Sequence, residues 1–146
     1  MLTQLLQNAM SSQGEARAQY LEEMSEVLAR GKWNAAEGAP VVAELVRMAA
    51  AETDNDMLEV LLNDLVSAFD CGITLDVALD PLLPLLDRVD DENLLDYLLH
   101  LLGQSRRMSF FPAISRFTGD SREAVRASAE SAMNELMGMS DDGAPA

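Results

Sequence analysis

A single histidine and a single cysteine limit the chemistry that this chain of 146 residues could perform. His100 lies four residues after Asp96, and on a helix this spacing would let the carboxylate orient the imidazole ring. The same spacing is typical of an ion pair on a helix surface, which is the simpler interpretation. Cys71, in the segment "FDCGI", is interpreted as a small loop or core residue rather than as a reactive thiol. The sequence therefore predicts no nucleophile with its base, no zinc site and no cofactor.

Two short clusters of carboxylates could in principle bind a hard cation. The first is Asp54, Asp56 and Glu59, and the second is Asp90, Asp91 and Glu92. Neither cluster has the glycine and the alternating ligands of an EF-hand loop. Both stand where helices are predicted to begin, and there the helix dipole and the free N–H groups favour acids. We therefore predict that these carboxylates cap helices and bind no metal.

Negative charge is concentrated in the middle of the chain. The formal net charge is −15, and residues 52–96 contain thirteen acids and one base, Arg88, which gives this segment a net charge of −12. Such a surface repels the phosphates of nucleic acids. It attracts basic proteins and accelerates their encounter. The sequence therefore predicts a protein partner and no nucleic-acid partner.

No targeting segment and no membrane segment are expected. Residues 1–13 have neither the basic start nor the apolar stretch of a signal peptide. The most apolar run, residues 82–102, includes six acidic or basic side chains, which a membrane span would not tolerate. One cysteine permits no internal disulfide, which fits a reducing compartment. These features predict a cytoplasmic protein.

Apolar residues recur with the helical period along the whole chain, and no alternating strand pattern is found. A first helix is predicted at 2–10, and a second begins at a capping box of Ser12 and Glu15 and ends at Gly31. Three helix pairs follow, each opened by a proline and closed near a glycine. The prolines are Pro40, Pro81 and Pro112, and the glycines are Gly72, Gly103 and Gly138. The sequence therefore predicts an all-α fold of about eight helices in antiparallel pairs.

The second helices of the three pairs align with one another in a single register. Steps of 36 and then 31 residues bring apolar residues together in four columns, as in helical-hairpin repeats. The columns are Leu58, Leu94 and Val125; Leu62, Leu98 and Ala129; Leu65, Leu101 and Ala132; and Val66, Leu102 and Met133. Candidate N-caps, Asp54, Asp90 and Ser121, share a further column. The alignment predicts an internal repeat.

Segment 112–138 resembles a HEAT repeat, in which a proline opens the first helix, an Asp lies in the turn and Val-Arg opens the second helix. The matching residues are Pro112, Asp120, Val125, Arg126, Ala129, Ala132, Met133 and Leu136. The match weakens over residues 38–103, where Leu58-Glu59 and Leu94-Leu95 replace Val-Arg. The resemblance implies a short α-solenoid, a right-handed superhelix in which Asp120 and Arg126 belong to a structural ladder. The implied domain spans 1–138, with a capping hairpin at 1–37, repeats at 38–72, 73–104 and 105–138, and a disordered tail at 139–146.

The second helix of the middle pair contains two leucines, Leu95 and Leu99, beyond those that one buried stripe requires. They indicate either burial between neighbours on both sides or the apolar centre of an interface. Aromatic side chains that could contact a partner are Trp33, Tyr97, Phe110 and Phe111. Trp33 could equally fasten the capping hairpin to the first repeat.

Charge and repeat pattern together suggest a non-enzymatic protein-binding module. In size, charge and architecture the chain is similar to the HEAT-type immunity proteins of polymorphic or contact-dependent bacterial toxin systems, so we expect an immunity protein that neutralises a basic toxin. The expected partner-binding residues are Asp56, Glu59, Asp64, Asp91, Glu92, Asp96, Tyr97 and His100.

Two other classes stay open. A HEAT-like scaffold or adaptor subunit would hold a protein assembly together without inhibiting anything. An enzyme on the same fold, such as a base-excision glycosylase or a phycobilin lyase, is the third class. An enzyme that acts on DNA would need a basic groove, and the charge distribution argues against one.

Overall fold

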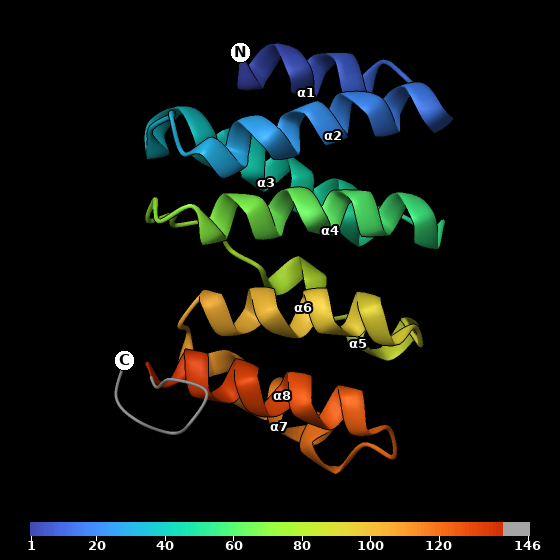
Figure 1. Cartoon of the computed structure of the whole chain (residues 1–146), viewed down its shortest axis with the longest axis vertical. Helices are drawn as coiled ribbons and strands as arrows, with labels where there is room; N and C mark the ends of the chain where they lie inside the picture. Colours follow the sequence, from blue (N-terminus) through green and yellow to red (C-terminus); the bar gives the residue numbers. More distant parts are fainter. Residues whose placement is uncertain (139–146) are drawn as a thin grey trace. The chain divides into compact units, whose positions relative to one another are not determined.

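The structure, a computed structural model, describes residues 1–138, which form eight α-helices and three 3₁₀ turns without a strand among them (Figure 1). The predicted all-α fold is confirmed. Within these residues no helix combines the length and the apolar character needed to cross a membrane. The chain divides into two compact units, Met1–Pro81 and the part from Leu82 onward. The single domain and its repeat boundaries stay predictions, and the expected tail at 139–146 lies outside the described residues.

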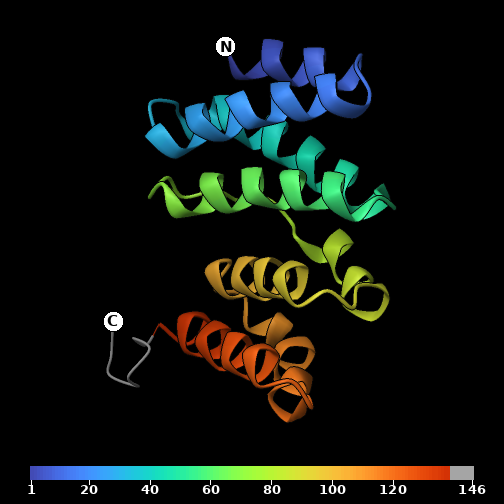
Figure 2. The ribbon, with the colours of Figure 1, turned by 45° about the vertical axis from the view of Figure 1, so that its right-hand side comes forward.

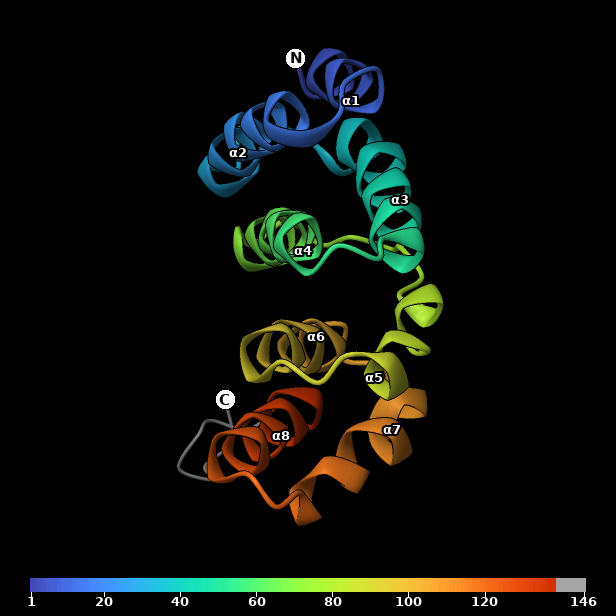
Figure 3. The same cartoon turned by 90° about the vertical axis from the view of Figure 1, so that its right-hand side faces the viewer.

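The first unit consists of four helices in two layers. They are α1 (Leu2–Met10), α2 (Gly14–Arg30), α3 (Ala35–Ala51) and α4 (Asn55–Asp70). Helix α2 packs against α1 and α4, and α3 packs against the same two helices. As Figure 3 shows, α2 and α4 form one layer, and α1 and α3 form the other. The layer of α2 and α4 therefore presents a continuous two-helix surface.

The second unit is built around one long helix pair. Helix α6 (Glu92–Gln104) packs against α8 (Glu123–Leu136), and α7 (Phe111–Ser115) packs against α8 (Figure 2). The remaining elements of this unit are α5 (Leu85–Arg88) and the 3₁₀ turns η2 (Met108–Phe110) and η3 (Arg116–Gly119), while the 3₁₀ turn η1 (Asp80–Leu82) spans the point in the sequence where the first unit ends. The helix that was predicted to open at Pro81 is thus broken. Pro84 explains the break, because proline has no N–H to donate and its ring clashes with the preceding turn.

Two predicted helix starts are wrong. Helix α3 begins at Ala35 because the side chain of Asn34 accepts a hydrogen bond from the N–H of Glu37 at 2.8 Å, so Pro40 lies inside the helix. The capping box at Ser12 does not form, because the Ser12 hydroxyl donates to the Asn8 carbonyl of α1 at 2.7 Å. The predicted stop of α2 at Gly31 is confirmed by its left-handed backbone, with φ of 68°.

The apolar columns of the repeat alignment lie in the interior. Ten of their twelve side chains are buried, and Val66 and Met133 are half-buried. Leu95 and Leu99 are also buried, so they form no exposed apolar patch. Among the aromatic residues, Trp33 and Phe110 are buried, whereas Tyr97 and Phe111 are half-buried.

Trp33 fastens the loop between α2 and α3. Its indole N–H donates to the Leu28 carbonyl at 3.0 Å, and its ring lies directly over Gly38, where a Cβ would stand 2.2 Å from a ring carbon. Trp33 precedes the Asn34 cap, and Gly38 is the fourth residue of α3, which are the positions that pack together in a hydrophobic staple. This contact and the Asn34 cap explain why α3 starts ahead of Pro40.

We expect Gly38→Ala to lower the free energy of unfolding by about 1–3 kcal/mol, because the added methyl group must displace the indole ring. This exceeds the roughly 1 kcal/mol by which alanine favours a helix over glycine. Trp33 is the chain's one tryptophan, so its emission reports the displacement directly. Urea unfolding followed by fluorescence measures both effects. Gly119→Ala, at a site with no atom within 4 Å, is the control. An unshifted emission maximum and midpoint in Gly38→Ala would contradict the staple.

Candidate partner-binding surfaces

Helices α2 and α4 are joined side by side through polar contacts. The hydroxyl oxygens of Ser25 and Ser67 are 2.9 Å apart, and the Asn63 amide donates to Ser25 at 3.1 Å. Gly31 at the end of α2 lies against Cys71 at the end of α4, so the helices run in the same direction (Figure 1). The position of these contacts determines which side chains of α2 and α4 lie beside the junction.

Exposed acids flank the junction on both helices. On α4, positions 56, 59, 63, 67 and 70 follow the helical period, so the acids at 56, 59 and 70 share the side of Asn63 and Ser67. On α2, Glu22 lies three residues before Ser25, and Glu26 lies one residue after it. We define the α2/α4 acidic face as Glu22, Glu26, Asp56, Glu59 and Asp70, all of which are exposed.

The sequence predicted only part of this face. Asp56 and Glu59 were expected to bind a partner, whereas Glu22 and Glu26 come from a helix that was assigned to the capping hairpin. Glu26 forms an ion pair with Arg30 at 3.9 Å, and both side chains are exposed. Exposed ion pairs of this kind contribute little to stability, so Glu26 can leave Arg30 and pair with a basic group of another protein.

Asp64, one of the predicted partner-binding residues, lies in the interior. Its exposed fraction is 0%, and among the described residues neither carboxylate oxygen has a hydrogen-bond partner. Burial, and secondly the negative charge of Glu22 on α2, raise the pKa of Asp64 to about 8. At neutral pH the carboxyl group is therefore protonated, and Asp64 belongs to the packed core beside the acidic face.

The other predicted residues lie in the second unit on or near α6. Asp91 and Glu92 are exposed at its N-terminus, and Tyr97 and His100 are half-buried. Asp96 and His100 line a pocket of about 270 Å³ between α6 and α8. Ser128, Ser131, Ala132 and Glu135 of α8 complete its lining. These α8 residues were not predicted, although the 31-residue repeat step places α8 residues near Asp96.

The polar groups of this pocket do not have the order of a catalytic triad. Ser128 donates its hydroxyl hydrogen bond to Asp96 Oδ1 at 2.6 Å. A hydrolase triad would instead place the imidazole between the hydroxyl and the carboxylate. The contact from Ser128 to Asp96 joins α8 to α6, which is a structural role.

One carboxylate of each predicted cluster caps a helix. Asp54 accepts a hydrogen bond from the Asp56 N–H at 3.1 Å at the start of α4. Asp91, rather than the predicted Asp90, caps α6 by accepting from the N–H groups of Asn93 and Leu94 at 2.9 and 3.1 Å. Within residues 1–138, no three His, Cys, Asp or Glu side chains are grouped to hold a metal ion.

Arg122, which the sequence did not single out, joins the turn before α8 to the turn before α6. Its side chain pairs with the Asp120 carboxylate at 3.0 Å and also donates to the Asp90 carbonyl. The side-chain hydrogen bond from Arg122 lowers the pKa of Asp120, and its backbone N–H adds to the effect. Arg126 donates to the Asp120 carbonyl at 2.8 Å. Arg126 therefore contacts Asp120 through the backbone, and Arg122 provides the side-chain pair, whereas the ladder between successive repeats stays a prediction.

Comparison of the chain with protein-family models, with curated proteins and with solved structures found no significant match in any of the three. The geometry defines the class of the protein as an all-α chain of packed helices.

Proposed function

We propose that the chain is a non-enzymatic protein-binding module that binds a basic protein through its acidic surfaces. The observation that carries this proposal is the exposure of the acids in residues 52–96. Of the thirteen, eleven are exposed, Glu52 is half-buried and Asp64 is buried. Charge of one sign at this density costs stability through self-repulsion, and a basic partner would relieve that repulsion.

The particular form of the proposal is a HEAT-like immunity protein that neutralises a cognate bacterial toxin in the cytoplasm. Support comes from the all-α fold, from the acidity, and from helices α2 and α4, which lie side by side and carry the α2/α4 acidic face. In the second unit, the Asp96 and His100 pocket adds hydrogen-bonding groups that such a partner could engage. The same charge argues against a nucleic-acid partner, because it repels phosphates.

The test compares two charge reversals of equal size. Glu26→Lys combined with Glu59→Lys changes the α2/α4 acidic face, and Glu23→Lys combined with Glu37→Lys changes exposed acids outside it. Because exposed charges act mainly on encounter, we expect the first pair to weaken binding about tenfold or more at low salt and the second to weaken it much less.

The partner is captured at low salt with the unaltered chain and identified by mass spectrometry, and its affinity for each variant is then titrated. Equal affinity of both double variants would contradict the assignment of the face. Co-expression then separates the two protein-binding classes. An immunity protein should restore growth to cells that produce the captured partner, whereas a scaffold or adaptor subunit would bind the partner without protecting them.

A further inference from the structure

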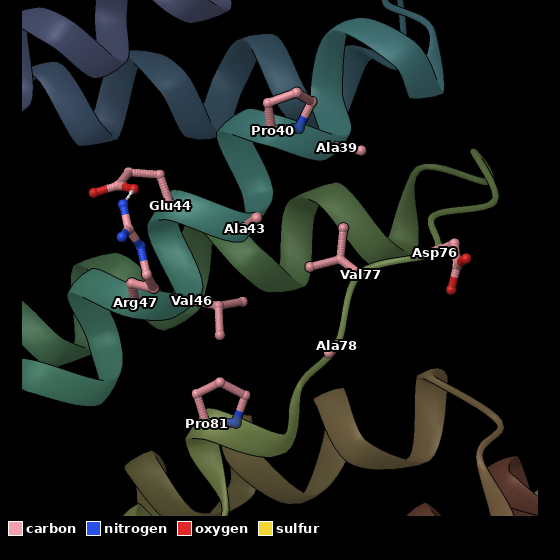
Figure 4. A pocket seen from close by; sticks show the side chains of 10 residues that line it. All are labelled: Ala39, Pro40, Ala43, Glu44, Val46, Arg47, Asp76, Val77, Ala78 and Pro81. Carbon is pink, nitrogen blue, oxygen red and sulfur yellow. Dashed lines mark hydrogen bonds and ion pairs between the residues drawn. The ribbon is translucent and has the colours of Figure 1, made fainter.

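A second surface, on the other layer of the first unit, is a pocket of about 520 Å³ between α3 and the segment that follows α4 (Figure 4). Its lining is largely apolar and includes Pro40, Ala43 and Val46 of α3 and Val77, Ala78 and Pro81 of the segment. In Figure 4, Glu44 and Arg47 lie at one end of the pocket and Asp76 at the other. The volume is within the range of ligand sites, and it exceeds what one side chain would fill.

The segment that forms one wall has the character of a strand without a partner. It runs as an extended chain past the pocket (Figure 4), and its side chains alternate, with Val77 and Leu79 buried and Ala78 and Asp80 exposed. Alternation with a period of two is the pattern of a half-buried strand. The segment nevertheless belongs to no sheet, since the described residues include no strand.

The backbone of this wall has unused hydrogen-bonding capacity. Within residues 1–138, no backbone hydrogen bond is found for the N–H and C=O groups of Thr74, Leu75, Val77 and Ala78, which precede the 3₁₀ turn η1. A peptide that lies alongside an extended segment can satisfy such groups by pairing with them as an added strand. Alternate side chains of that peptide would then point into the pocket against Ala43 and Val46.

The lining distinguishes between possible ligands. A small-molecule site is expected to combine apolar walls with a few converging polar side chains that fix orientation. Here the polar groups along the apolar wall are those of an extended backbone, which fit another backbone. The segment also carries exposed acids, Asp76 and Asp80, within the stretch of net charge −12. This charge favours a peptide with basic residues.

We propose that this pocket binds an extended segment of a protein partner, which adds as a strand to residues 74–79 and inserts an aliphatic or proline side chain between basic neighbours. The proposal does not depend on the function proposed above, because it concerns the opposite layer and none of the residues of the α2/α4 acidic face. The pocket therefore gives the chain a peptide site separate from its acidic surface.

The probe is a displayed library of random octapeptides, selected for binding to the full chain. We expect enrichment of peptides with an aliphatic residue or proline flanked by Lys or Arg. An enriched peptide, made synthetically, should shift the amide NMR signals of residues 74–79. Methylation of its alternate backbone nitrogens should weaken binding about tenfold, since each methyl group removes a pairing N–H.

Two matched variants locate the site. Ala43→Trp places a large side chain in the pocket and is expected to weaken the binding of the enriched peptides about tenfold or more, which corresponds to the loss of one well-packed contact. Ala36→Trp places the same side chain at an exposed position of α3 outside the pocket and should leave affinity unchanged. An unchanged far-UV circular dichroism spectrum and an unchanged unfolding midpoint establish that each variant is folded.

Three results would overturn the proposal. They are a selection without enrichment, enriched peptides that bind Ala43→Trp as well as the native chain, and signals of residues 74–79 that shift with chain concentration alone. The last result would identify a second copy of this chain as the occupant.

Discussion

Asp64→Asn is expected to raise the free energy of unfolding at pH 7, and its advantage over the native chain should grow steadily between pH 4 and pH 8. The folded chain keeps the Asp64 proton up to a pKa of about 8, whereas the unfolded chain loses it near the ordinary value of 3.8. Between these limits the folded state binds one proton more than the unfolded state, so stability falls as pH rises. The loss is about 1.4 kcal/mol for each pH unit and stops above pH 8, where both states are ionised.

The asparagine variant has no such proton to lose. At pH 7 we therefore expect its free energy of unfolding to exceed that of the native chain by a few kcal/mol. This is on the order of the loss that the native chain accumulates over the roughly three pH units between pH 4 and pH 7. The measurement is urea unfolding of both chains at intervals from pH 4 to pH 9. Comparison of the two curves cancels the titration of the other acids, because they are common to both chains.

Two further variants identify the cause. Glu59→Gln removes one carboxylate from the same helix at an exposed position, and its curve should stay parallel to that of the native chain. Glu22→Gln removes the second cause of the raised pKa of Asp64. The pH range over which stability falls should therefore end at a lower pH in this variant. Parallel curves for Asp64→Asn and the native chain across pH 4–8 would refute the buried, protonated carboxyl group.

The sequence predicted the packing of the second helices better than the starts of the first ones. Leu58, Leu94 and Val125 share one buried column because periodicity within a long helix records which side faces inward. The start of α3 depends on the contact of Trp33 with Gly38, which joins residues on two sides of a cap. A proline marks a place where a helix can begin, but it does not require the helix to begin there.

The acidic surface was predicted from charge, and its composition depended on information that the sequence does not contain. Aspartate is almost never fully buried unless it is paired, so Asp64 was expected at the surface. Its position between Leu61 and Ala68, both buried, was the one local signal of an inward direction. Glu22 and Glu26 joined the face only because α2 packs beside α4, a contact between residues about forty positions apart.

Gly103 was predicted to end a helix, and α6 does end one residue later, at Gln104, but Gly103 also has a role in packing. It lies inside α6, with an ordinary helical backbone, and it is buried. A Cβ at this position would stand 2.7 Å from the carbonyl oxygen of Ala132 and 3.0 Å from its Cα. Absence of a side chain therefore lets α6 and α8 approach closely at this point.

Gly103→Ala is consequently expected to destabilise the chain by about 3 kcal/mol, because the obstacle is the backbone of α8, which cannot change rotamer as a side chain can. This outweighs the roughly 1 kcal/mol that alanine contributes to an exposed helix. Urea unfolding at pH 7 measures the loss, with Gly119→Ala as the control at an open site. The double variant Gly103→Ala with Ala132→Gly adds a sharper criterion. Since the clash involves main-chain atoms of Ala132, removing its methyl group should restore little stability. Full recovery in the double variant would mean that side chains, rather than backbones, set the distance between α6 and α8.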